Sequence, residues 1–223
     1  MYKVKFLNGT TRKFKTLKGA DLEEANLEDA NLKNANLERA NLRSANLKNA
    51  YLEDAILRGA YLEDAILIGA ILIGAILRCA NLTDAYLEDA NLKSAYLEKA
   101  DLDRANLRSA YLKDANLKDA ILSGVNFTDA DLRNANLRGA QLTDANFKGA
   151  SLKGANLFNI NILTFQLGKH FAFYHEGYLK IGCQGYDLEY WIKNVDKIGK
   201  DNNYTEAEIA LYKAMITLIK DHA

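Results

Sequence analysis

The chain has 223 residues, and 29 lysine and arginine residues balance 29 aspartate and glutamate residues. This balance indicates neither the basic excess of a nucleic acid-binding protein nor the acidic excess of a polyanion mimic. Two cysteines are too few for a disulfide framework, the opening lacks the apolar run of a signal peptide, and no uncharged stretch is long enough to span a bilayer. We therefore expect a cytoplasmic protein with no membrane segment.

Residues 1–15 are predicted to form an N-terminal strand or hairpin that caps the rest of the chain. Alternate residues from Tyr2 to Phe6 are apolar, as in a half-buried strand, and the pair Asn8-Gly9 favours a hairpin turn. A cap is needed here because the stacked strands predicted for the repeat section, described next, would otherwise end in an unpaired strand edge.

A five-residue repeat dominates the middle of the chain. Leucine or phenylalanine stands at every fifth position from Leu17 to Leu157, and alanine stands two residues earlier from Ala20 to Ala155, with a single valine as the exception. A helix would spread these leucines around its circumference, and a flat strand would send them to alternate faces. The chain must instead bend once per repeat, so that four bends close a square coil of 20 residues and the coils stack at strand spacing.

The repeated unit, Ala-(Asn/Asp)-Leu-x-x, occurs for example at residues 30–34 and 100–104 and resembles the pentapeptide repeat family. This resemblance implies an all-β fold, a right-handed quadrilateral β-helix of about seven to eight coils over residues 16–168. The last position of each repeat is often glycine, aspartate, asparagine or serine, which suit tight turns and tolerate positive φ. The core is predicted to alternate small alanine with large leucine.

Residues 169–223 are expected to form a small mixed α/β module that caps the far end of the β-helix. A hairpin turn is predicted at Glu176, and a helix follows behind a possible cap at Asp187. Thr205 and Glu208 have the spacing of a capping box that opens a second helix. The apolar face of that helix must be covered, either by the end of the coil or by a second chain.

The motifs that carry chemistry in common enzyme classes do not occur in the chain. There is no phosphate-binding loop, nucleotide fingerprint, nucleophile elbow or paired-cysteine motif, and a leucine-filled interior leaves no room for a buried site. His170, His175 and Cys183 lie close together in sequence, but their spacing matches no zinc motif. We therefore expect no enzyme, and no catalytic, cofactor or metal site.

An apolar belt is the first candidate contact surface. Outward positions of consecutive repeats are apolar near the middle of the repeat section, and they surround the rod because 20 residues make one circuit. Such residues either stabilise stacked strands as ladders or offer a contact surface to a partner or a second copy. The belt consists of Tyr51, Ile56, Tyr61, Ile66, Ile68, Ile71, Ile73 and Ile76.

A basic column is the second candidate surface. Outward positions directly after the core leucines are mostly basic in the later coils, and four of them are 20 residues apart, which places them in one column. The column is either a solvated face, partly neutralised by neighbouring acids, or an anion-binding site. It consists of Lys93, Lys113, Arg133 and Lys153.

These observations favour a non-enzymatic structural or interaction rod with an unidentified protein partner, a monomer rather than a homodimer. The family resemblance implies an alternative, because its quinolone-resistance members imitate duplex DNA with an acidic rod and bind DNA gyrase. The section from Thr16 to Ile160 departs from that pattern, with 21 acids against 17 basic residues and no inserted loop. Direct nucleic acid binding is not favoured, because the basic residues lack a stacking platform beyond Tyr111.

Overall fold

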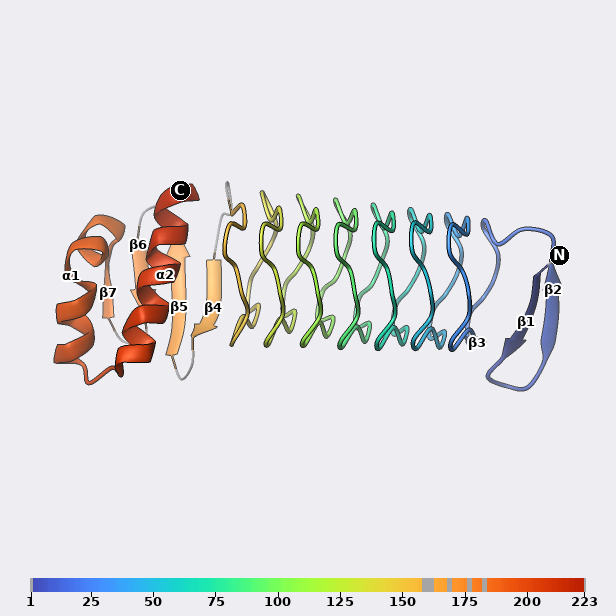
Figure 1. Cartoon of the computed structure of the whole chain (residues 1–223), viewed down its shortest axis with the longest axis horizontal. Coiled ribbons are helices and arrows are strands. Elements are labelled where there is room, and N and C mark those ends of the chain that lie inside the picture. Colours follow the sequence, from blue (N-terminus) through green and yellow to red (C-terminus); the bar gives the residue numbers. More distant parts are fainter. Residues whose placement is uncertain (1, 158–162, 168–169, 176–177, 182–183, 223) are drawn as a thin grey trace.

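The computed structural model describes residues 2–157, 163–167, 170–175, 178–181 and 184–222. The molecule is a rod with stacked coils along its centre, a β-hairpin at the N-terminal end, and a sheet with two helices at the other end (Figure 1). In this described part of the chain, no helix is long and apolar enough to cross a membrane.

Residues 20–157 form a four-walled parallel β-helix. Isolated parallel β-bridges join residues 20 apart and recur at every fifth residue, beginning with the bridge between Asp21 and Asn41. Between coils, the Leu72 N–H donates a hydrogen bond to the Asn91 carbonyl oxygen at 2.7 Å. Each residue therefore lies beside its counterpart one coil further on, as the repeat predicts.

A turn residue in the left-handed region bends the chain once per repeat. From Gly19 to Gly154, every fifth residue has a positive φ, between 53° and 74°. Across one such turn, the Ala75 N–H donates to the Leu72 carbonyl oxygen at 3.0 Å. Glycine, asparagine and aspartate hold most of these positions because they adopt positive φ most readily. This confirms the predicted role of the last position in each repeat.

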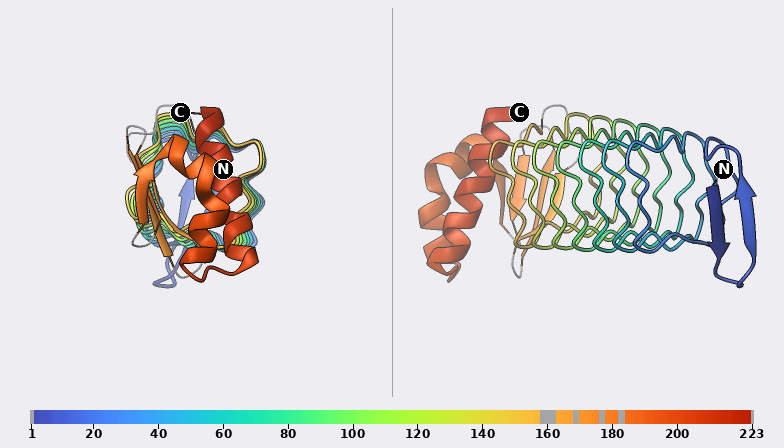
Figure 2. Two further views of the ribbon diagram at one scale, coloured as in Figure 1. Left: turned by 90° about the vertical axis from the view of Figure 1, so that its left-hand side faces the viewer. Right: turned by 45° about the vertical axis from the view of Figure 1, so that its right-hand side comes forward.

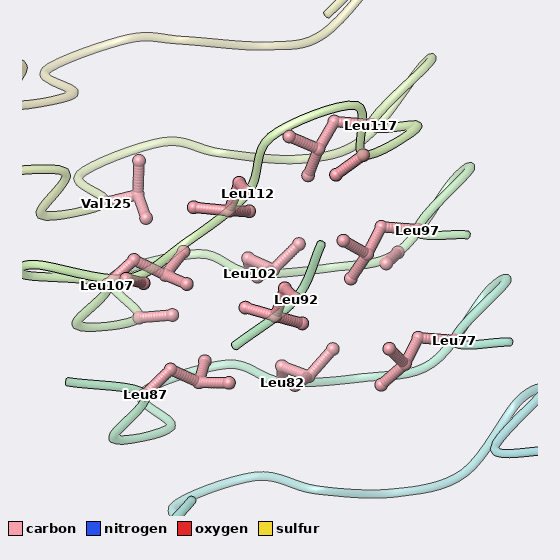
Figure 3. Packing of buried hydrophobic residues seen from close by; sticks show 14 of the residues in the cluster. Leu77, Leu82, Leu87, Leu92, Leu97, Leu102, Leu107, Leu112, Leu117 and Val125 are labelled. Carbon is pink, nitrogen blue, oxygen red and sulfur yellow. The ribbon is translucent and has the colours of Figure 1, made fainter. Parts of the chain in front are cut away.

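Leucine and alanine fill the interior of the rod. The core leucines from Leu37 to Leu142 are fully buried, and those of successive coils lie over one another in columns (Figure 3). Phe127 and Phe147 replace leucine in one column, and their rings stack with centroids 5.1 Å apart. Small and large side chains thus alternate in a narrow tube that they fill throughout its length.

The N-terminal hairpin extends one wall of the β-helix. Strand β1 (Tyr2–Phe6) pairs antiparallel with β2 (Thr11–Phe14) and with β3 (Ala25–Asn26) of the first coil, in the order β2-β1-β3. Val4 and Phe6 are buried as part of the rod's core. The hairpin therefore covers the first coil with its inner face.

The hairpin loop has three residues, one more than the two-residue turn that Asn8-Gly9 would favour. The Gly9 N–H donates to the Phe6 carbonyl oxygen at 2.9 Å, and the Phe6 N–H donates to the Thr10 carbonyl oxygen at 2.9 Å. Gly9 has φ +83°, so glycine is required at the last loop position rather than within a two-residue turn.

Four antiparallel strands form a second sheet beyond the last coil. Their order is β4-β5-β6-β7, and Figure 1 shows β4 beside the coils with β5 next to it. The strands are β4 (Leu163–Leu167), β5 (His170–His175), β6 (Tyr178–Ile181) and β7 (Gln184–Asp187).

Helices α1 (Leu188–Asp201) and α2 (Glu206–His222) pack against each other and against this sheet (Figure 2). Both predicted N-terminal caps are confirmed. The Asp187 side chain accepts the Tyr190 N–H at 2.7 Å, and the capping box forms with the Glu208 N–H donating to Thr205 Oγ1 at 3.2 Å.

Trp191 joins the first helix to the sheet. Its side chain is fully buried, and its Nε1 donates to the Leu179 carbonyl oxygen of β6 at 2.7 Å. A buried indole needs a partner for its N–H, and this bond supplies it.

Strand β4 falls within the range 16–168 that we expected to be β-helix, yet it pairs antiparallel with β5. Among the residues that the structure describes, the series of left-handed turn residues ends at Gly154. Thr164 stands at a position where a further turn residue would be needed, and a β-branched side chain disfavours positive φ. The chain therefore runs straight through this position as a strand. The division into three domains stays a prediction.

Replacing Leu72 by lysine should lower the free energy of unfolding by several kcal/mol, because the ammonium group would enter a dry, fully packed interior. Ile73→Lys is the matched control, since Ile73 is 37 % exposed and should accept the same side chain with little change. Urea denaturation of both variants measures the difference. An unchanged midpoint for Leu72→Lys would contradict the burial of the core leucines.

Removing residues 163–223 should make the rod self-associate, because the last coil would expose the buried Ala155 and Leu157 and a free strand edge. Analytical ultracentrifugation of the full chain and the shortened chain compares their association. A full-length dimer that becomes a monomer on shortening would show instead that the C-terminal part is a dimerisation module.

Candidate interaction surface

Each repeat contributes one wall of the rod together with the corner that follows it, and residues 20 apart share a wall. We number the walls by the outward residues of the first coil. In the first full coil, the first to fourth walls are residues 21–24, 26–29, 31–34 and 36–39, respectively, with one inward leucine in each, and Lys18 extends the fourth wall by one coil toward the N-terminus. This register assigns every charged residue of the repeat section to one wall.

The first wall is strongly acidic. Its outward positions hold nine carboxylates and two basic residues, and both basic residues pair with carboxylates of the same wall. Arg43 lies 3.0 Å from Glu63, and Arg104 lies 2.7 Å from Asp84. The nine carboxylates are Asp21, Glu23, Glu24, Glu63, Asp64, Asp84, Asp101, Asp103 and Asp144.

The fourth wall has the opposite charge, with seven basic residues and three acids. Together, the third and fourth walls hold 12 basic residues against seven acids, whereas the first and second walls hold 14 acids against five basic residues. Charge is therefore segregated across the width of the rod. The basic residues of the fourth wall are Lys18, Arg39, Arg58, Arg78, Lys99, Lys118 and Arg138.

Arg104 joins two coils of the first wall. Its guanidinium donates to both carboxylate oxygens of Asp84, at 2.9 and 2.7 Å, and it also contacts Asp103 of its own coil. The hydrogen bonds from Arg104 hold the pKa of Asp84 below its ordinary value. Asp84 thus remains ionised beside the unpaired carboxylates of this wall.

The residues of the apolar belt lie on all four walls, and cations contact two of its tyrosines. Tyr51, Tyr61 and Ile73 are exposed to 41 %, 44 % and 37 %, and the other isoleucines are half-buried. Lys33 Nζ lies 5.2 Å from the ring centroid of Tyr51, and the Arg43 guanidinium lies 4.7 Å from that of Tyr61. Cations therefore cover part of the belt, and its role as a contact surface stays a prediction.

The four residues of the basic column, Lys93, Lys113, Arg133 and Lys153, stand at equivalent positions of successive coils on the third wall. Arg133 donates to both oxygens of Asp131, at 2.7 and 2.6 Å, and these bonds lower the pKa of Asp131. The three lysines form no ion pair within the part of the chain that the structure describes. Arg133 is thus already engaged, and anion binding by the column stays a prediction.

The side chains of His170, His175 and Cys183 lie outside the described residues. Among the residues described, no group of three or more histidine, cysteine, aspartate or glutamate side chains is placed to hold a metal ion. Cys79 is exposed, as its place at the end of a repeat predicts.

The family model described as pentapeptide repeats (8 copies) matches this chain in five overlapping segments, at residues 20–59, 45–84, 55–93, 85–124 and 120–159. The chain belongs to the pentapeptide repeat family. The β-helix of this family is right-handed, and its members are generally structural or interaction proteins rather than enzymes.

Solved structures of pentapeptide repeat proteins resemble the chain. A trypsin-treated form of QnrB1, a plasmid-mediated fluoroquinolone resistance protein, is 21 % identical over 60 % of this chain and 68 % of its own, with a TM-score of 0.58. HetL from the cyanobacterium Nostoc sp. strain PCC 7120, which is involved in heterocyst differentiation regulation, is 29 % identical over 69 % of this chain and 90 % of its own, with a TM-score of 0.26. Of these two, the QnrB1 match supports the shared fold. No match was found among curated proteins.

The acidic first wall of this pentapeptide repeat protein was not among the surfaces that the sequence predicted. Its carboxylates are dispersed along the chain, as Asp64, Asp84 and Asp144 illustrate, and they gather only when residues 20 apart are superposed. Writing the sequence in rows of 20 would have shown the wall.

Arg104→Gln should raise the pKa of Asp84 toward its ordinary value, because the hydrogen bonds that favour the carboxylate are lost. The pKa of Asp84 is depressed in the folded chain, so its ion pair stabilises the fold above the unfolded-state pKa and loses this effect as pH falls through the folded-state pKa. An NMR titration of the Asp84 carboxyl carbon measures the shift. Arg108→Gln on the second wall is the control, and an equal shift in both variants would refute the assignment.

Proposed function

We propose that this chain is a non-enzymatic interaction rod, of seven to eight coils, that binds a basic protein surface along its first wall in the cytoplasm. The excess of carboxylates on that wall is the observation that carries the proposal. The filled core favours a binding role over catalysis, because substrate would have no buried place to react.

The first wall suits a partner that presents several cations at once. Glu24 and Asp64 are exposed and form no ion pair within the described residues, so their charges are directed to solvent. Exposed charges are screened beyond about 8 Å at physiological salt, and a single ion pair at a surface contributes little. Carboxylates from several coils of the first wall must therefore bind the partner at the same time. The fixed spacing of the coils permits this.

Interference with DNA gyrase is the second candidate function. An acidic wall on a rod whose fold matches QnrB1 favours it, since an acidic rod can take the place of duplex DNA on a basic protein surface. The basic fourth wall and the absence of an inserted loop between residues 20 and 157 argue against it. We therefore rank interference with DNA gyrase below binding to an unidentified basic protein.

Charge reversal on the first wall tests the proposal. Glu24→Lys with Asp64→Lys replaces two exposed turn residues, and Asp54→Lys with Asp114→Lys makes the same change at the same turn position on the third wall. Cross-linking in host lysate at physiological salt, followed by mass spectrometry, compares the three proteins. We expect a partner captured by the wild type and the third-wall variant, and lost at least tenfold from the first-wall variant.

Equal capture by all three proteins, or no capture by the wild type, would contradict a docking role for the first wall. A gyrase supercoiling assay with the same proteins distinguishes the second candidate. We expect supercoiling to be unaffected at micromolar protein. Inhibition by the wild type that the first-wall variant loses would establish gyrase as the target.

A further inference from the structure

Strand β2 is the outermost strand at the N-terminal end of the rod (Figure 1). It pairs with β1 on one side, and its other edge has no strand beside it among the described residues. The Phe6 N–H bonds to the Thr10 carbonyl oxygen, and bonded and non-bonded residue pairs then alternate along the hairpin. This alternation directs the N–H and C=O groups of Thr11 and Lys13 away from β1, toward solvent.

The hairpin is basic throughout. Residues 1–18 include six basic residues and no acid, namely Lys3, Lys5, Arg12, Lys13, Lys15 and Lys18. Arg12 lies 3.4 Å from Asp21 and over the Phe6 ring, whereas Lys3, Lys5 and Lys13 form no ion pair within the described residues.

Two of these lysines repel each other by their placement. Lys3 and Lys13 are directly opposite in the hairpin register, and Lys5 follows on the same outward face. Theirs is a non-bonded pair, the type in which opposed side chains approach most closely. Like charges in this arrangement destabilise a hairpin. A carboxylate placed between them would convert this repulsion into attraction.

We propose that the outer edge of β2 is a docking site for an extended acidic segment of a partner protein, which adds as a further strand beside β2. The main-chain groups of Thr11 and Lys13 would pair with that strand, and its carboxylates would meet Lys13 on the neighbouring strand, with Lys3 one strand further away on the same face. Strand addition to a free sheet edge takes its affinity from main-chain hydrogen bonds and its specificity from side chains. This site is separate from the first wall. It would bind an acidic partner, whereas the first wall would bind a basic one.

The charges distinguish this occupant from others. A second copy adding its own β2 would bring lysine against lysine, which is how edge lysines prevent self-association. A long nucleic acid would extend from the hairpin over the first coil, where strand β3 pairs with β1 and is flanked by the acids Glu24, Glu28 and Asp29, and these charges would repel its phosphates. A short acidic strand on the edge avoids both conflicts.

Fluorescence anisotropy with the full chain tests the proposal. The probe is an acetylated, fluorescein-labelled seven-residue peptide of alternating glutamate and valine. Lys13→Glu removes the charge, and Thr11→Pro removes an outward N–H while every lysine remains, a substitution that an edge strand accepts. Lys48→Glu, an exposed lysine of the second wall, is the control. We expect both hairpin variants to bind at least tenfold more weakly than the wild type, and Lys48→Glu to bind within twofold of it.

Hydrogen exchange on the wild type gives an independent measurement in case Thr11→Pro disturbs the hairpin. Bound peptide should slow exchange of the Thr11 and Lys13 amides and leave wall residues unchanged. No binding of the peptide, or unslowed amides, would overturn the proposal. Full binding by Thr11→Pro would show a contact through charge alone, and preferential competition by a DNA duplex would identify nucleic acid as the occupant.

Discussion

The left-handed turn residue two positions after each core leucine or phenylalanine, from residue 17 to residue 152, is the constraint on which this structure depends. It turns the chain so that alanine and leucine, two residues apart, both point to the rod axis. Residues other than glycine, asparagine and aspartate meet a cost of about 1 to 2 kcal/mol in this conformation, yet Cys79 and Lys99 adopt it. The Cys79 N–H bonds to the Glu98 carbonyl oxygen of the next coil at 3.1 Å. Hydrogen bonds between stacked coils thus stabilise turns that an isolated repeat would not form.

The same register determines what the walls can carry. Where asparagine precedes the core leucine, its side chain serves two coils: Asn46 Oδ1 accepts the Lys48 N–H at 3.1 Å, and Asn46 Nδ2 donates to Glu28 at 3.3 Å. The tyrosines and isoleucines of the apolar belt cannot form these bonds. Two pairs of them occupy equivalent positions of successive coils instead, Tyr51 with Ile71 and Ile56 with Ile76. Apolar ladders of this kind stabilise stacked strands without any partner.

Periodicity predicted the coil, the core and the turns because every repeat obeys the same local constraint. The burial of Leu72 follows from its position in the repeat alone. The sequence did not indicate the antiparallel pairing of strand β4, because apolar spacing continues through it whereas the pairing depends on residues that follow it in the chain. The first wall was missed because residues 20 apart were superposed only at the position directly after the core leucine, whereas six of its nine carboxylates stand at other positions of the repeat. Asp84 and Arg104 are 20 residues apart and yet form one bidentate pair.

The spacing of the rows also limits what the first wall can bind. Its coils recur about every 4.8 Å, the distance between neighbouring strands, and three successive coils, at residues 61–64, 81–84 and 101–104, carry carboxylates. A basic helix lying along the wall presents one turn about every 5.4 Å, so the two patterns drift apart by about 0.6 Å per coil. Flexible lysine side chains accommodate the roughly 2 Å that accumulate over four coils. Because the first wall is rigid, binding orders the partner's side chains more than those of the wall. The affinity then depends on how many coils of the wall stay aligned with turns of the partner helix.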